Sequence, residues 1–508
     1  MDLQVLTCPI SMAETVLDTA AENAFDLDIH LPEYYPDIQR ILRCTVTPNI
    51  HAVTVGQDRV NAEGSGVMRM LYAAEDKKVV SFEQTFPISK STPWKEIPEA
   101  AVTAFAKTDF VNCRASGQRK ATVHGVVSLR FRAQKKTQQS VVIGAENPCL
   151  QMRRKPAQAI SLNACAERNF AMSEVVEVGA QNPPVSRILR SHSTISVESV
   201  KAIKDKLLVK GELLTDVLYA PESGEELCSF RHAMPVSQIL EAAGIEENNV
   251  QDISLQVVSL ETTPKADGSG EQRLLEIAVR VQASVRSGAQ IQMQTVQDAY
   301  TTEGALQAEY QEMEMHTLSQ QINDSMTAKQ TFDLTGESIA SLLDAFCGTV
   351  QTAYHTEEDT VVFTCETTVS FLYRDMDGNP AMADRQMTFT YRKILPEKTE
   401  RADCMPVVQI SGCKASLGAD GKVEVKLEIL LSGTVYAVHK QRVLVSAQAQ
   451  EETAQAERPA LTIYFTDPGE AVWDIARRYK TTAEAILAEN ELTGETIDEK
   501  RMLIIPRA

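Results

Sequence analysis

The sequence predicts a mainly β protein in which three tandem β-rich, sandwich-like units of about 150 residues precede a small βααβ domain. Three observations lead to this prediction. Segments of the chain repeat at a constant offset, many short runs alternate between apolar and polar residues, and residues 461–508 follow the order strand, helix, helix, strand. The length of 508 residues also exceeds what one hydrophobic core supports.

The first two copies of the repeat align without gaps. Residues 36–43 match residues 183–190, and the same offset of 147 residues carries residues 64–72 onto residues 211–219. A constant register over such a length indicates duplication of a folded unit, because chance matches do not keep their spacing.

A third and weaker copy ends in Phe371-Leu372-Tyr373 and has Cys365 where the first two copies have Gly64 and Gly211. Each copy also carries an upstream Ala-Glu/Lys-x-x-Phe motif, which ends at Phe25, Phe170 and Phe332. We therefore expect five segments: unit one at 1–148, unit two at 149–305, a divergent unit three at 306–446, a flexible linker at 447–460 and a final domain at 461–508.

Within the units the pattern is mainly that of antiparallel strands. Residues 422–429 and 275–281 alternate strictly, and each run follows a Gly-rich turn, which is typical of hairpins. Residues 375–379 faintly resemble a calcium loop, but the ligand spacing is wrong, so a hairpin turn is the better interpretation. We also expect short amphipathic helices at Ile38–Leu42, Ile239–Ala243 and Ile339–Phe346.

The last domain can be divided into elements one by one. Residues 461–465 alternate as a half-buried strand does, with the apolar side chains Leu461, Ile463 and Phe465 on one face, and Pro468-Gly469 then turns the chain. A first helix places its apolar residues at i, i+3, i+4 and i+7, and a second begins at the capping box formed by Thr481 and Glu484. The apolar run 502–505, stopped by Pro506, supplies the return strand.

This order of motifs, from Pro468-Gly469 through residues 472–476 to Ile504-Ile505-Pro506, closely resembles a LysM domain. The resemblance implies binding of N-acetylglucosamine polymers such as peptidoglycan, or of a protein partner, through the strand–helix loop, the face 477–480 and the loop 490–494. The residues that we expect to bind are Gly469, Glu470, Ala471, Val472, Arg477, Lys480, Asn490, Glu491, Leu492 and Thr493.

This copy departs from the LysM pattern in the binding loops. Glu470-Ala471 stands where the family has an acid followed by Thr or Ser, and neither residue is a good N-cap, which costs about 1 kcal/mol of helix stability. Lys480 replaces the usual Gly after the Arg-Tyr pair. Because these changes alter the groove and keep the fold, the sequence favours a protein partner over a glycan. Trp473 is expected to pack in or near the core, although an indole can also stack on a sugar.

Bulk composition narrows the functional classes. The formal net charge of −19 argues against nucleic acid or an anionic membrane surface as the partner, and the sequence shows neither a secretory signal nor an apolar run of spanning length. The ten cysteines form no C-x-x-C pair, which favours a reducing, cytoplasmic compartment with idle thiols. We find no catalytic motif and no metal-ligand spacing among the eight histidines, so we expect no enzyme activity, no metal and no cofactor.

The pairing of β-rich repeats with one C-terminal LysM resembles the SPOCS-domain (DUF3794) proteins of endospore formers, of the SipL type. Residues 31–42 and the strand that runs from Gly to Leu-Tyr in units one and two carry this resemblance. It implies a non-enzymatic scaffold of spore coat or envelope assembly, located in the mother-cell cytoplasm at the forespore surface. The implied partner is the coat ATPase, stage IV sporulation protein A. The alternative is a peptidoglycan-binding protein that uses the LysM groove.

Overall fold

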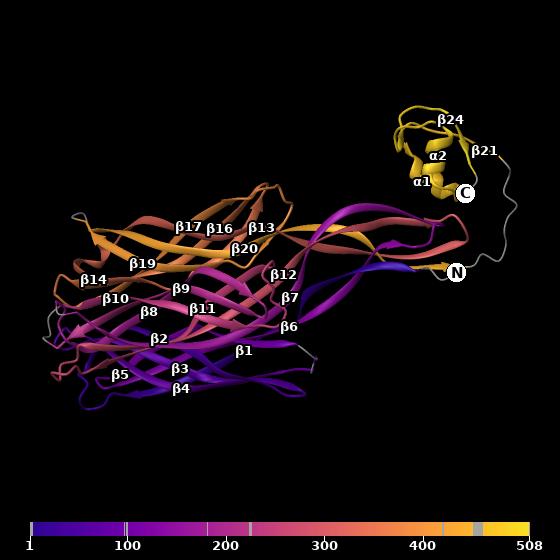
Figure 1. Cartoon of the computed structure of the whole chain (residues 1–508). Helices are drawn as coiled ribbons and strands as arrows, with labels where there is room; N and C mark the ends of the chain where they lie inside the picture. The colour runs from indigo at the N-terminus through magenta and orange to yellow at the C-terminus, as the bar shows by residue number, and fades with distance from the viewer. Residues whose placement is uncertain are drawn as a thin grey trace.

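The computed structural model describes residues 4–95, 97, 100–179, 181–222, 226–418, 421–450 and 461–506. It consists of a body of packed β-sheets, a long β-arm that leaves the body, and a small domain beside the far end of the arm (Figure 1). The expected mainly β fold, with two α-helices in the C-terminal part of the described chain, is confirmed. No helix in the described ranges is long and apolar enough to cross a bilayer.

The strands of the three units follow one another without a long interruption. Unit one contains β1 (Val5–His30), β2 (Ile38–Val55), β3 (Arg59–Ala74), β4 (Val79–Pro93), β5 (Ala101–Gly117) and β6 (Lys120–Ala145). Unit two contains β7 (Leu150–Glu177), β8 (Val185–Ile203), β9 (Lys206–Pro221), β10 (Cys228–Glu241), β11 (Val250–Lys265) and β12 (Leu274–Thr301).

Unit three has the same order of strands, but two strands that are continuous in the other units are each split into two shorter strands. It contains β13 (Ala305–Asp333), the 3-10 turn η1 (Thr335–Glu337), β14 (Ile339–Cys347), β15 (Gln351–Glu357), β16 (Thr360–Asp375), β17 (Pro380–Ile394), β18 (Ala402–Cys404), β19 (Val407–Leu417) and β20 (Lys422–Gln450). Residues 447–450, expected in the linker, therefore belong to β20, and the rest of the expected linker lies outside the described residues.

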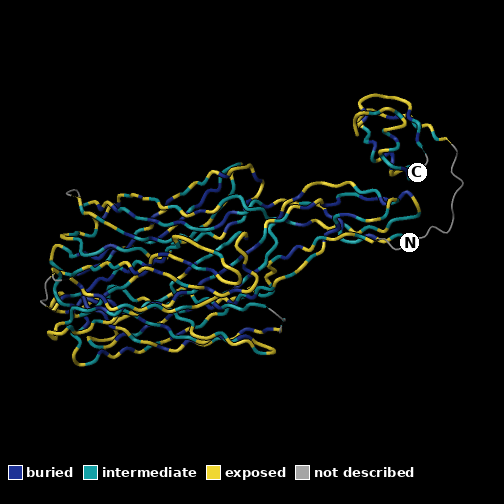
Figure 2. Tube along the Cα trace, viewed as in Figure 1, coloured by how far each residue is buried: buried dark blue, intermediate teal, exposed yellow. Residues whose placement is uncertain are grey.

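Each unit is a sandwich of two antiparallel sheets. In unit one the sheets have the strand orders β2-β3-β4 and β1-β6-β5, and in unit two β8-β9-β10 and β7-β12-β11. In unit three, β14 and β15 share one edge of β16 while β17 takes the other, and β20 lies between β13 and the pair β18 and β19. One apolar core fills each sandwich, and Figure 2 shows buried and exposed positions alternating along the strands, as expected for sheets with one wet face.

The three helices expected inside the units are wrong, because these segments lie in or at the end of strands. Ile38–Leu42 is in β2, Ile339–Phe346 is in β14, and Ile239–Ala243 is the end of β10 and the following turn. In β2 the register shifts twice, between Ile38 and Arg40 and again between Ile41 and Arg43. Each bulge inserts a residue and changes the phase of the alternation, so a strand shows apolar residues at helical spacing. Strands β8 and β14 carry the same pair of bulges.

The glycines shared by units one and two are explained by a further bulge. A Cβ on Gly64 would lie 2.1 Å from the carbonyl oxygen of Asn49, and one on Gly211 would lie 2.0 Å from that of Ser196. In both units the bulge of the neighbouring strand pushes its backbone against the glycine. In unit three the edge strand is interrupted between β14 and β15 at this point, so Cys365 is accommodated and pairs with Thr352.

One tyrosine in each unit is hydrogen bonded to the segment just before the second strand, which is β2, β8 or β14. The hydroxyl of Tyr72 donates to the carbonyl of Pro36 at 2.9 Å, and that of Tyr219 donates to Pro183 at 3.2 Å. Tyr373 donates to a carboxylate oxygen of Glu337 at 3.0 Å, and in all three units the partners are 36 residues apart. Unit three therefore keeps the architecture of the repeat, although its sequence lacks the proline.

The three units meet around a shared apolar cluster. Leu71, Leu218 and Leu372, which precede the three tyrosines, belong to one cluster together with Leu42, Leu189 and Leu343. Arg190 forms an ion pair with Asp344 at 3.1 Å beside it. Because equivalent side chains of all three units are in contact there, the body has a pseudo-threefold axis, which each unit approaches with the same strands.

The first and last strands of each unit extend past the body and form the arm. Strand pairs β1–β6, β7–β12 and β13–β20 contain strands of 26 to 29 residues, several times the usual length. They enclose two apolar clusters to which all three pairs contribute. In the outer cluster, Val142, Val296 and Leu444 occupy equivalent positions. The arm is thus a six-stranded extension of the body and keeps its symmetry.

Candidate functional site in the C-terminal domain

The C-terminal domain folds as expected and contains β21 (Thr462–Phe465), β22 (Glu470–Ala471), α1 (Val472–Tyr479), α2 (Ala483–Glu489), β23 (Thr496–Ile497) and β24 (Met502–Ile505). Strand β21 pairs with β24, and β22 pairs with β23. The helices bury Val472, Ile475 and Ile486 against Leu503 of the return strand. The second helix is capped by Thr482, whose hydroxyl accepts from the amide of Ala485, so the expected cap at Thr481 is one residue early.

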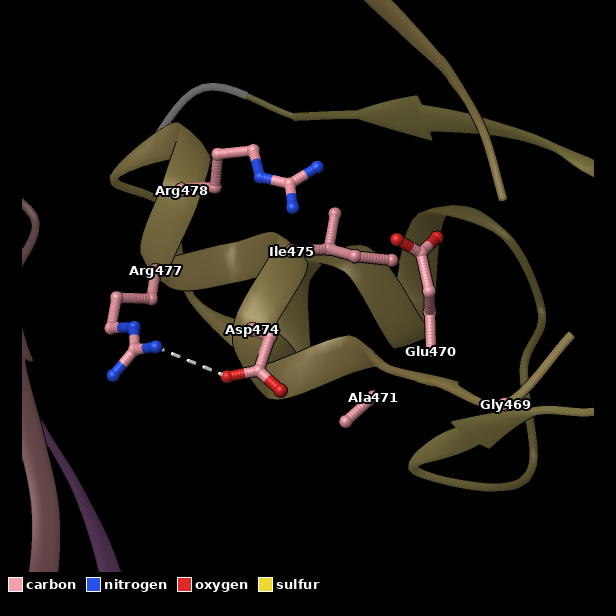
Figure 3. Close-up of a pocket in the computed structure, with 7 residues that line it drawn as sticks. All are labelled: Gly469, Glu470, Ala471, Asp474, Ile475, Arg477 and Arg478. Atoms are coloured by element: carbon pink, nitrogen blue, oxygen red, sulfur yellow. Dashed lines mark hydrogen bonds and ion pairs between the residues drawn. The ribbon is translucent and has the colours of Figure 1, made fainter. Parts of the chain in front are cut away.

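A shallow pocket of about 510 Å³ opens at the start of α1. It is lined by Gly469, Glu470, Ala471, Asp474, Ile475, Arg477 and Arg478. Figure 3 shows the two acids and the two arginines around Ile475, with Arg477 and Asp474 on one side and Glu470 and Arg478 on the other. Gly469 takes a positive φ of 89°, which lets its amide donate to the carbonyl of Ile497 at 2.7 Å and closes the loop on β23.

The charged side chains Glu470 and Arg478 of this pocket are hydrogen bonded to residues beside it. Glu470 accepts from the hydroxyl of Tyr464 at 2.7 Å and from the amide of Asp467 at 3.1 Å. Arg478 donates to the same hydroxyl at 2.9 Å. The hydrogen bond to the Glu470 carboxylate raises the pKa of Tyr464, because the phenol must keep its proton to donate. Ala471 offers α1 no side-chain cap, as the sequence predicted.

The opposite side of α1 faces the arm, and Asp298 of β12 is the centre of this contact. Its carboxylate accepts from the indole nitrogen of Trp473 at 2.8 Å and from the guanidinium of Arg477 at 2.8 Å. Asp298 directly follows the residue at which the register of β12 shifts, and such a bulge changes the direction of the next side chains.

Tyr300 completes the contact between the arm and the domain. Its ring meets that of Trp473 edge to face, with centroids 4.9 Å apart, and its hydroxyl donates to the carbonyl of Thr481 at 2.8 Å. Lys480 donates to the carbonyl of Gly304 at 2.9 Å from a left-handed backbone, φ 51°, at the end of α1. Trp473 is therefore half-buried, as the sequence predicted, but its partner is the arm.

The ten residues expected to bind are thus separated by the fold. Gly469, Glu470 and Ala471 line the pocket, while Arg477 and Lys480 bind the arm, although Arg477 also reaches the edge of the pocket. The side chains of Val472 and Leu492 pack in the core, and Asn490 bonds to Ile486 and to both backbone groups of Ile504. Glu491 and Thr493 are exposed on the loop after α2, which does not line the pocket.

Sequence reasoning missed Asp298 and Tyr300, although the repeat contains a signal for them. The register shifts at the same place in all three units, just after Val142, Val296 and Leu444. Asp298 follows this shift in unit two, and the residues in the same position are Gly144 in unit one and Ser446 in unit three. Only unit two has a carboxylate at this point of the arm. A repeat position where one copy alone carries a charge is a candidate for a contact outside the repeat.

The outer face of the small sheet is the second unexpected feature. Strand β21 alternates as predicted, but Tyr464 points inward, while Leu461, Ile463 and Phe465 are exposed; Phe465 is 73% exposed. Met502, the partner of Phe465 in β24, is exposed as well. The half-buried strand that the alternation predicts is present, but its apolar residues form the exposed face. Leu503 and Ile505 of β24 fill the core, and Tyr464 packs there against Tyr479.

Comparison with known families agrees with this architecture. Residues 37–116 and 184–264 match the family model described as SipL, SPOCS domain, and residues 467–506 match the LysM domain. The chain carries two SPOCS domains and a C-terminal LysM domain. The SPOCS segments span β2 to β5 and β8 to β11, and the equivalent part of unit three, β14 to β19, has the same plan. No curated protein and no solved structure matches the chain.

Both families are binding domains, and the SPOCS and LysM pair indicates a sporulation-related adaptor or binding protein. Among the described residues no group of three or more His, Cys, Asp or Glu side chains could hold a metal ion. The pocket of the LysM domain contains carboxylates and guanidinium groups, but no serine, cysteine or histidine lines it. Its chemistry suits polar recognition.

Proposed function

We propose that the protein is a non-enzymatic adaptor of spore coat or envelope assembly that docks through its LysM domain to a coat morphogenetic protein. The partner we propose is an ATPase of the stage IV sporulation protein A type, met in the mother-cell cytoplasm at the forespore surface. The observation that supports docking to a protein is the exposed apolar face of Leu461, Ile463, Phe465 and Met502 on the LysM sheet. Clustered exposed apolar side chains are a common mark of protein interfaces.

The hydrogen bonds within and around the LysM pocket also favour a protein partner over a glycan. A sugar groove needs polar groups that are free to bond hydroxyls, yet Glu470 is bonded to Tyr464 and Arg477 to Asp298. A glycan would have to break these contacts and replace them. A protein that covers the apolar face leaves them intact.

The test is capture of the purified partner by the full-length chain, with Phe465→Glu as the disrupting variant. We expect binding to fall at least tenfold, because a carboxylate in an apolar contact loses its hydration without a partner. Met376→Glu is the matched control, since Met376 is also 73% exposed but lies in the hairpin between β16 and β17. Equal capture by both variants would exclude the apolar face as the docking surface.

A second candidate function is binding of peptidoglycan or another N-acetylglucosamine glycan. The match to the LysM family and the pocket at the strand–helix loop favour it. Titration of the full-length chain with soluble N-acetylglucosamine oligomers separates the two functions. Saturable binding that is lost in Glu470→Ala and kept in Phe465→Glu would support the glycan, and no binding would support the protein partner.

A further inference from the structure

The two-stranded sheet formed by β21 and β24 of the LysM domain has one closed edge and one open edge. The outer edge of β24 is closed by Asn490, whose side-chain amide donates to the carbonyl of Ile504 at 2.7 Å and accepts from its backbone amide at 2.7 Å. A neighbouring strand would make these same two bonds. Strand β21 pairs with β24 on one side, and no strand among the described residues pairs with its other side.

The register shows which backbone groups lie on the open edge. Successive pairs of an antiparallel ladder alternate between hydrogen-bonded and non-hydrogen-bonded. Both backbone groups of Ile504 point away from β21, so its register partner Ile463 directs its own amide and carbonyl to the open edge. The amide of Thr466 donates to the carbonyl of Arg501 at 3.0 Å, so this pair is hydrogen-bonded. Phe465, one residue earlier, therefore directs its backbone groups outward as well.

The open edge of β21 lacks the features that protect other edge strands of this chain. Exposed edges are commonly protected by charged residues and proline, because unpaired backbone groups bind other strands. Strands β4, β10 and β17 are edge strands of the body, and each contains charged residues and a proline, at Pro87, Pro235 and Pro380. Residues 461–466, Leu-Thr-Ile-Tyr-Phe-Thr, contain neither. The edge of β21 is therefore suited to accept a strand.

The open edge borders the exposed apolar face of the same strand. Leu461, Ile463 and Phe465 are all exposed, and their side chains share one face because residues i and i+2 of a strand point the same way. A strand added to this edge places alternate side chains beside them. Backbone hydrogen bonds then provide the pairing, and apolar side chains provide the specific contact. Both features fit the same ligand, an extended polypeptide with apolar residues at every second position.

We propose, building on the proposed function, that an extended segment of the protein partner adds to β21 as a third strand of the LysM sheet. The segment needs about four to six residues, because β21 itself is only four residues long. Its backbone bonds the amide and carbonyl groups of Ile463 and Phe465, and its apolar side chains extend the outer face. A glycan lacks donors and acceptors that alternate at the spacing of a strand, so the edge selects a polypeptide.

Hydrogen exchange of the full-length chain, read at single residues, tests the added strand directly. The amides of Ile463 and Phe465 point to the open edge and should exchange rapidly in the free protein. With the purified ATPase of the stage IV sporulation protein A type, we expect their exchange to slow by roughly tenfold or more. The amide of Ile504 is protected before binding and serves as the internal reference. Equal exchange of both outward amides in the free and bound protein would overturn the proposal.

Two substitutions at one position separate the backbone from the side chain. Ile463→Pro removes an amide that points outward, so the ladder between β21 and β24 keeps its bonds, and proline is tolerated at a sheet edge. Ile463→Ala removes the apolar side chain but keeps the amide. We expect the ATPase to bind Ile463→Pro roughly tenfold or more weakly than Ile463→Ala. Equal tryptophan emission of the two variants checks that the domain is folded in both, because Trp473 lies in it.

The same variants distinguish a failure of the added strand from a failure of the proposed function. If the wild type does not bind the ATPase, or Phe465→Glu binds it equally well, the docking face and the added strand are both refuted. If Phe465→Glu loses binding while Ile463→Pro and Ile463→Ala bind equally, docking stands and the added strand is refuted. Self-association of the wild type in light scattering that is lost in Ile463→Pro would identify a second copy as the added strand and overturn the proposal.

Discussion

Replacing Asp298 by alanine should release the LysM domain from the arm. Its carboxylate accepts two hydrogen bonds of 2.8 Å, from Trp473 and from Arg477. A hydrogen bond to a charged acceptor contributes about 1.5–3 kcal/mol, and an ion pair whose arginine is 48% exposed adds only a few tenths to 1 kcal/mol. The sum is about 2–4 kcal/mol, which corresponds to a docking equilibrium weakened roughly 30- to 900-fold.

Tryptophan fluorescence reads this change directly, because the chain has two tryptophans. Trp94 is buried in the core of unit one, so Trp94→Phe leaves Trp473 as the single reporter. In the docked state the indole contacts Tyr300 and is bonded to Asp298. Asp298→Ala should shift the emission of Trp473 to the red and increase its quenching by acrylamide, since the indole gains contact with water.

Asp474→Ala is the control for this experiment. Asp474 also pairs with Arg477, at 3.4 Å, but it belongs to the same helix and does not contact the arm. Its removal should leave the emission of Trp473 unchanged. If Asp298→Ala gave the same spectrum and the same quenching as the wild type, Asp298 would not hold the two parts together.

Three further substitutions test the repeated fold. Gly64→Ala should lower the free energy of unfolding by more than about 2 kcal/mol, because the added Cβ would meet a backbone oxygen. Cys365→Ala, at the equivalent position of unit three, should lower it by less, and urea unfolding of the two variants measures the difference. Leu372→Ala, at the pseudo-threefold axis, should cost about 2–5 kcal/mol by the same assay, and a cost below 1 kcal/mol would contradict the axis as a packed core. The pKa of Asp324 is lowered by hydrogen bonds from Lys393 and Tyr391. The stabilisation from Asp324 is therefore present above the usual Asp pKa of 3.8 and is lost as the pH falls through the lower folded value, so Asp324→Asn should reduce the melting temperature at pH 7 but not near pH 2.

The sequence was sufficient to predict the architecture, because the unit is repeated along the chain and its strands and turns follow from residues that are close in sequence. Alternation along residues 275–281 predicted a strand, and Leu275, Ile277, Val279 and Val281 are buried as that pattern requires. The expected hairpin at residues 375–379 is confirmed as the turn between β16 and β17. Two of the three failed helix predictions, in β2 and β14, occurred where double bulges give a strand the apolar spacing of a helix. The third, Ile239–Ala243, lies at the regular end of β10 and in the turn after it.

The candidate site was less predictable, because its geometry depends on a contact between distant parts of the chain. The LysM pattern placed Gly469, Glu470 and Ala471 in the pocket, since this loop is local to the domain. It could not show that Arg477 and Lys480 are directed to the arm, about 180 residues earlier in the chain, where local patterns carry no information. Nor could alternation alone decide which face of β21 is buried, because a shift by one residue exchanges the two faces.

Lys480 links the departure from the LysM pattern to the role of the arm. The position at the end of α1 has a left-handed backbone, which favours glycine and strains a lysine. The lysine makes a contact that glycine cannot make, with the carbonyl of Gly304 beside the end of β12. The substitution therefore gives up some stability in the helix end for a contact with unit two. Lys480, Trp473 and Arg477 together hold α1 against the arm. The apolar face that contains Phe465 stays exposed in this arrangement, as the proposed docking surface requires.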